Sequence, residues 1–135
     1  MSYSNMKPME AKSHKYIADW VKKGGILVYT GRDDDPFQSV YEWWNQGGNG
    51  FAAPSDHLFR LMGIPAGAAE GTYTYGKGTV CVLRHDPKEY VLTEGGAEEY
   101  VNRIAELYPG TVEFTHTYRI THENNPDGVA VEFEW

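Results

Sequence analysis

The sequence predicts an α/β domain, a layered fold with a mainly parallel sheet, followed by a C-terminal antiparallel β-hairpin. Three observations predict it. Residues 26–30 form a short continuous apolar run, which is typical of a parallel strand covered on both faces. Segments with the apolar spacing of helices flank this run. From residue 111 onward, apolar and polar residues alternate, which indicates strands with one face in solvent.

Composition limits the possible classes of protein. The chain has 135 residues, enough for one domain with a core but too few for two ordinary domains. We expect residues 1–110 to form the α/β part and residues 111–135 a hairpin extension. The net charge of −7, with scattered Lys and Arg, disfavours a nucleic-acid partner. No apolar run has membrane-spanning length and no signal peptide is visible, so we expect a soluble chain without a membrane partner.

The first predicted elements are a helix over residues 8–23 and a strand over residues 26–30. Pro8 suits the first position of a helix, and Gly24 or Gly25 suits the position just after its end. His14 and Ile17 belong to the apolar set of this helix. Residues 2–5 resemble the tail of a preceding strand.

Two helices are predicted after this strand. Asp35 is a candidate N-cap with Pro36 as the first helical residue. The buried stripe of this helix would be Phe37, Val40, Tyr41 and Trp44, and the glycines at residues 47–50 would end it. The next helix would start at residues 53–56, with Leu58, Phe59, Leu61 and Met62 facing inward.

The remaining elements are strands and one more helix. Residues 72–75 and 79–83 are β-prone and are joined by a glycine-containing loop of hairpin length, and the second run is the better central strand. A helix is expected over residues 95–107, with Ala97, Tyr100, Val101, Ile104 and Leu107 on one side. The tail predicts a hairpin with a turn at residues 123–128.

The candidate binding residues follow the predicted parallel strands, because ligands in α/β sheets collect at the carboxyl ends of strands. Arg32, Asp33 and Asp34 follow the strand at residues 26–30, where carboxylates can ligate a hard cation or bind sugar hydroxyls. The alternative is structural: Asp35 caps a helix, and acidic residues at a helix N-terminus are favourable without a ligand.

His85 and Asp86 follow the strand at residues 79–83. If the two strands are neighbours, these residues would form a mixed His/carboxylate cluster with the aspartate loop, able to bind a metal or to act as acid and base. The alternative is a turn in which Asp86 precedes Pro87 and has no ligand.

Trp43 is a candidate platform for a sugar ring, because it lies off the centre of its apolar stripe. Cys81 lies inside a predicted strand, so we expect it to be a small buried residue rather than a nucleophile. The loop at residues 76–78 lacks the Walker pattern. The histidines at residues 14, 57, 116 and 122 lack metal-ligand spacing and predict no site, and no cofactor is expected.

Three segments carry a resemblance to a known family. Residues 14–28 run from a helix through a glycine pair into a strand, and residues 56–64 and 75–83 supply later pieces of the same pattern. This arrangement resembles class I glutamine-amidotransferase-like (flavodoxin-like) domains, including the non-catalytic versions attached to bacterial β-galactosidases and related glycoside hydrolases. The resemblance implies a layered α/β/α fold, and the chain looks like the C-terminal part of such a domain, a fragment of a larger protein.

The nucleophile elbow of active glutaminases is absent from the sequence, so the resemblance does not imply glutamine hydrolysis. It implies a non-catalytic accessory or oligomerisation domain of a carbohydrate-active enzyme, whose partners are other domains of that enzyme or further copies of itself. Two other hypotheses are a sugar-binding module using Trp43 and the loop at residues 31–35, and a small metal-dependent hydrolase using Asp33, Asp34, His85 and Asp86.

Overall fold

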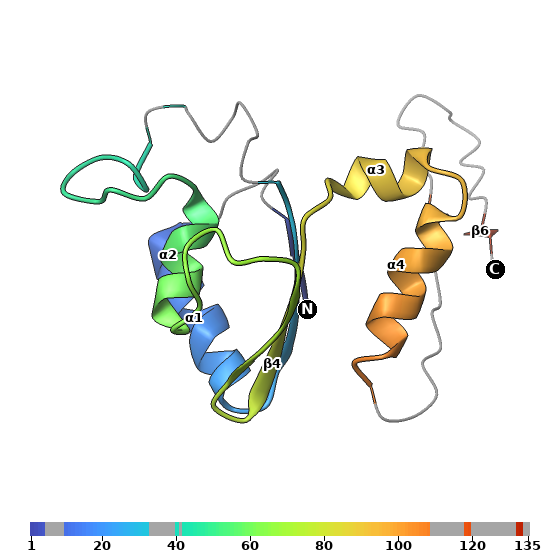
Figure 1. The fold of residues 1–135 in the computed structure, drawn as a ribbon, viewed down its shortest axis with the longest axis horizontal. Coiled ribbons are helices and arrows are strands. Elements are labelled where there is room, and N and C mark those ends of the chain that lie inside the picture. Colours follow the sequence, from blue (N-terminus) through green and yellow to red (C-terminus); the bar gives the residue numbers. More distant parts are fainter. Residues whose placement is uncertain (5–9, 33–39, 41, 109–117, 120–131, 134–135) are drawn as a thin grey trace, which may run out of the picture.

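The centre of the structure, a computed structural model, is a four-stranded sheet (Figure 1). The structure describes residues 1–4, 10–32, 40, 42–108, 118–119 and 132–133. The sheet has the order β1-β2-β4-β3. Its strands are β1 (Ser2–Ser4), β2 (Ile26–Thr30), β3 (Gly71–Tyr75) and β4 (Gly78–Leu83). β2 pairs in parallel with β1 and with β4, whereas β3 pairs antiparallel with β4. The sheet is therefore mixed, and the chain is of the mixed α/β class.

Helices pack on both faces of the sheet, because alternate side chains of each strand point to opposite faces. Leu27, Tyr29, Val80 and Val82 form one core with residues of α1 (Ala11–Lys22) and α2 (Pro54–Leu61). Val28, Cys81 and Leu83 form a second core with residues of α3 (Pro87–Leu92) and α4 (Gly96–Ala105). Figure 1 shows α1 and α2 on one side of the strands and α3 and α4 on the other. The prediction that β2 is covered on both faces is confirmed.

α1 begins later than predicted. Glu10 precedes it with an extended backbone (ψ 149°), so the helix starts at Ala11 rather than at residue 8. Its C-terminal end follows the prediction: Gly24 has a φ of 120°, and its backbone N–H donates to the carbonyl of Val21. His14, Ile17, Ala18 and Val21 form the buried face of α1.

The helix predicted after Pro36 is wrong for the part of it that the structure describes. Residue 40 is a bend, and residues 43–45 form a turn. The side chain of Asn45 accepts a hydrogen bond from the backbone N–H of Glu42 and donates one to the carbonyl of Val40. These local hydrogen bonds compete with helix formation, which explains the difference. Trp44 is buried as expected, but Val40 is 45% exposed.

The later elements mostly follow the predictions. α2, the hairpin of β3 and β4, and α4 occupy the expected segments, and β4 is central. Leu61 is exposed rather than inward-facing, as are Ala97 and Val101 on α4. The sequence analysis missed α3, which begins at Pro87 with Asp86 as its N-cap residue.

The C-terminal tail shows antiparallel pairing at its described positions, where β5 (Tyr118–Arg119) pairs with β6 (Glu132–Phe133). The other parts of the predicted hairpin lie outside the described residues. Among the helices that the structure describes, none is long and apolar enough to cross a membrane.

Candidate functional site

The carboxyl ends of β2 and β4 lie side by side and bring two predicted loops together. Thr30 is the register partner of Leu83, and the N–H of Gly31 donates to the carbonyl of Leu83 at 3.0 Å. The predicted cluster required these two strands to be neighbours, and they are. Arg32 and His85 lie at this edge of the sheet, whereas Asp33 and Asp34 lie outside the described residues.

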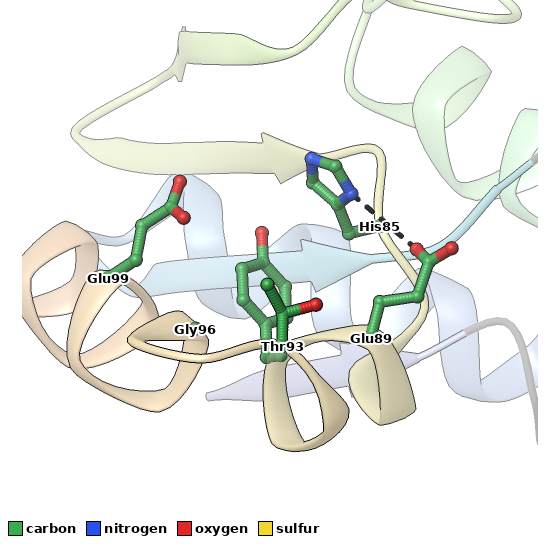
Figure 2. Close-up of a pocket in the computed structure, with 6 residues that line it drawn as sticks. His85, Glu89, Thr93, Gly96 and Glu99 are labelled. Carbon is green, nitrogen blue, oxygen red and sulfur yellow. Dashed lines mark ion pairs between the residues drawn. The ribbon is translucent and has the colours of Figure 1, made fainter.

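Glu89 joins the two loops. Its Oε1 is 3.1 Å from Arg32 Nη1. Its Oε2 is 3.5 Å from His85 Nδ1, the ion pair that Figure 2 shows as a dashed line. Glu89 also accepts a hydrogen bond of 2.8 Å from the backbone N–H of Asp86. This backbone hydrogen bond, followed by the contact with Arg32, lowers the pKa of Glu89. The sequence analysis missed Glu89, although an Asp followed three residues later by Glu resembles the pairing of a capping box.

A second carboxylate extends this cluster from the segment before β3. Glu70 Oε2 is 4.0 Å from His85 Nε2, and Glu70 Oε1 is 3.5 Å from Arg103 Nη2. Asp86 lies at the N-cap of α3 with its carboxylate 3.8 Å from Lys88 Nζ, so it occupies the turn position that the sequence analysis gave as the alternative. Arg32 and His85 thus meet through Glu89, and within the described residues no group of three or more His, Cys, Asp or Glu is placed to hold a metal ion.

The cavity beside this cluster is small. It has a volume of about 80 Å³ and is lined by His85, Glu89, Tyr90, Thr93, Gly96 and Glu99 (Figure 2). Sites for small organic ligands usually exceed about 300 Å³, so this cavity has room for a few water molecules at most. Burial raises the pKa of Tyr90 to about 12, which keeps its hydroxyl protonated. The cluster can hold α3 to the sheet through its ion pairs.

Two histidines form a second cluster that the sequence analysis did not predict. Tyr3 Oη is 2.8 Å from His14 Nε2, and His14 Nδ1 is 3.0 Å from His57 Nδ1. Burial, and then the charge on His57, lower the pKa of His14 from 6.5 to about 4. Burial, and then Arg60, lower the pKa of His57. The pair is therefore neutral near pH 7, and it links β1, α1 and α2 through hydrogen bonds.

Trp43 belongs to this second cluster. Its ring meets the rings of His14 and His57 edge-on, with centroids 5.5 Å and 5.2 Å apart, and it also contacts Trp44. Trp43 is half-buried, so part of the indole stays accessible. Cys81 is buried in β4, and burial raises its pKa, so its thiol is not activated as a nucleophile.

An apolar groove opens on the α3–α4 face of the sheet. It has a volume of about 320 Å³ and is lined by Thr30, Pro87, Tyr90, Val91, Ala97, Tyr100 and Val101. Val91 is 79% exposed and Val101 is 40% exposed, and the neighbouring Leu92 is 82% exposed. The term "α3–α4 groove" refers below to these lining residues together with Leu92.

Comparison of the chain with protein-family models, with curated proteins and with solved structures finds no match.

Proposed function

We propose that the chain is a non-catalytic accessory domain that acts through protein–protein contacts, with the layered α/β/α architecture of amidotransferase-like domains, and that it serves assembly in a carbohydrate-active enzyme. The observation that carries the proposal is the α3–α4 groove. Large contiguous patches of exposed apolar surface are rare on monomeric proteins, and where they occur they often mark a site of protein association. Val91 and Leu92 are adjacent in sequence and almost fully exposed, which is costly unless a partner covers them.

The polar cluster supports the same proposal. Arg32 and His85 each contact Glu89, and Glu89 also accepts a hydrogen bond from the backbone N–H of Asp86, the residue before α3. These contacts stabilise the position of α3, and α3 carries half of the groove. The sugar-binding and hydrolase hypotheses depend on residues 33 and 34, which lie outside the described residues, so the accessory role is the function that the described geometry supports best.

Sedimentation velocity over a range of protein concentrations tests the proposal. We expect reversible self-association of the wild-type chain and its loss in the double variant Val91→Lys/Leu92→Lys. Both side chains are more than three-quarters exposed, so the substitutions leave the core intact. The control is Val40→Lys, which places a lysine on an exposed apolar residue outside the groove. A wild-type chain that stays monomeric at every concentration would refute the proposal, as would a double variant that associates like the wild type.

A further inference from the structure

A second exposed surface, with a positive charge, lies on α1. Lys12, Tyr16 and Trp20 are spaced four residues apart, and Lys23 follows three residues later, so they form one stripe along the helix. Tyr16 is 63% exposed and Trp20 is 42% exposed, although both are large aromatic side chains. The segment at residues 12–23 contains four lysines and a single acidic residue, Asp19. These four residues, Lys12, Tyr16, Trp20 and Lys23, are called the α1 stripe below.

The α3–α4 groove is acidic around an apolar centre. Residues 87–101 contain four glutamates and one lysine, Lys88. Glu94, Glu98 and Glu99 are all exposed, and within the described part of the chain no ion pair to them is found. The α1 stripe therefore consists of exposed aromatic rings with lysines beside them, and the groove is an apolar surface with glutamates beside it.

One copy of the chain cannot bring these two surfaces together. α1 packs on the core formed with Leu27 and Val80, and α3 and α4 pack on the core of the opposite face, formed with Val28 and Cys81. Figure 1 shows the sheet between α1 and the α3–α4 pair. The contact therefore requires a second copy.

We propose that the chain associates head to tail, with the α1 stripe of one copy docked in the α3–α4 groove of the next. This inference rests on the proposed function and specifies its contact surface. A helix presenting aromatic side chains to an apolar groove is a common mode of protein recognition. Tyr16 and Trp20 are the anchors, because buried aromatic residues contribute most to such interfaces.

Charge selects this pairing over other contacts between copies. The chain carries a net charge of −7, so most pairs of surfaces on two copies repel each other. The α1 stripe is an exposed basic surface, and its lysines face the glutamates around the groove when the two surfaces meet. Because each contact uses two different surfaces, an open assembly always has one free stripe and one free groove, so it grows as a chain unless these two surfaces meet and close a ring.

A mixing experiment tests the proposal. The stripe variant is Lys12→Ala/Tyr16→Ala, which changes two exposed residues to the best helix former. The groove variant is Val91→Lys/Leu92→Lys. Each variant alone should associate at least about tenfold more weakly than the wild type. An equimolar mixture of the two variants should form a dimer, because the intact stripe of the groove variant can dock in the intact groove of the stripe variant. The dimer should grow no further, because its remaining stripe and groove are both mutated. Added salt should weaken the wild-type association.

The control for the stripe variant is Lys22→Ala, which removes a lysine from the same helix but away from the stripe, and it should associate like the wild type. A wild-type chain that associates while the stripe variant associates equally well would overturn the head-to-tail contact and leave the accessory role standing. A mixture of the two variants that stays monomeric would overturn it as well. A wild-type chain that never associates would remove both proposals.

Discussion

Acidification is expected to destabilise the fold through His14. This imidazole is fully buried, and both of its nitrogens are engaged, Nε2 with Tyr3 Oη at 2.8 Å and Nδ1 with His57 Nδ1 at 3.0 Å. Between two facing ring nitrogens there is room for one hydrogen, so one nitrogen donates and the other accepts. If both of these Nδ1 atoms carried a proton, two N–H groups would face each other in a buried site.

The magnitude follows from proton linkage. His14 has a pKa of about 4 in the folded chain and an ordinary value of 6.5 when unfolded. Between these two values the unfolded state binds a proton that the folded state does not, so the free energy of unfolding falls as the pH drops through 6.5 and the loss is complete below about 4. At about 1.4 kcal/mol for each pH unit between them, His14 contributes a loss of about 3 kcal/mol.

Urea denaturation from neutral pH down to about pH 4 measures this loss. The variant His14→Gln cannot take up the proton, so its free energy of unfolding should depend on pH less steeply than that of the wild type, by about 3 kcal/mol over the range. Carboxylates titrate in both proteins and cancel in the comparison. Ile17→Val, on the same buried face of α1, is the control: it should cost about 1 kcal/mol at every pH and leave the pH dependence unchanged. Equal pH dependence in His14→Gln and the wild type would refute the reasoning.

Two further predictions concern β4. Gly78→Ala should lower the free energy of unfolding by about 3 kcal/mol, because the added Cβ would overlap the backbone oxygen of Val21; Gly50→Ala, where a Cβ meets nothing within 4 Å, should have little effect, and equal urea midpoints for the two variants would contradict this. Cys81 should react with a thiol reagent far more slowly in the folded chain than in urea, because it is buried and burial raises its pKa; equal rates in both conditions would contradict this.

The strands could be predicted because their signal is local. Residues 26–30 are apolar without interruption, and β2 occupies the same five residues. The segment at residues 42–46 could not be predicted in this way, because its apolar spacing resembles a helix while the side chain of Asn45 satisfies backbone groups of a turn. An Asp-Pro pair at Asp35 predicts the start of a helix, and the described part of that predicted helix is a bend and a turn. The same pair at Asp86 and Pro87 does begin a helix, α3, which was not predicted.

Half of the candidate site could be predicted from strand adjacency. Arg32 and His85 follow two apolar runs, and parallel pairing of those runs brings them to one edge of the sheet. Glu89, which joins them, comes from a helix that the sequence analysis did not predict, so its position could not be inferred. The ion pairs of this cluster depend on side-chain placement, which the spacing of residues in sequence does not determine.

The His14–His57 pair could have been inferred once the strand order was known. His14 was already placed on the apolar face of its helix, and a buried polar group needs hydrogen-bond partners. The steps from β1 to β2 and from β2 to β4 run in the same direction across the sheet. Right-handed crossovers then put α1 and α2 on the same face. Both helices begin near the carboxyl ends of the parallel strands, and His14 and His57 are each the fourth residue of their helix. Equal height on two neighbouring helices brings the two imidazoles together, although 43 residues separate them in sequence.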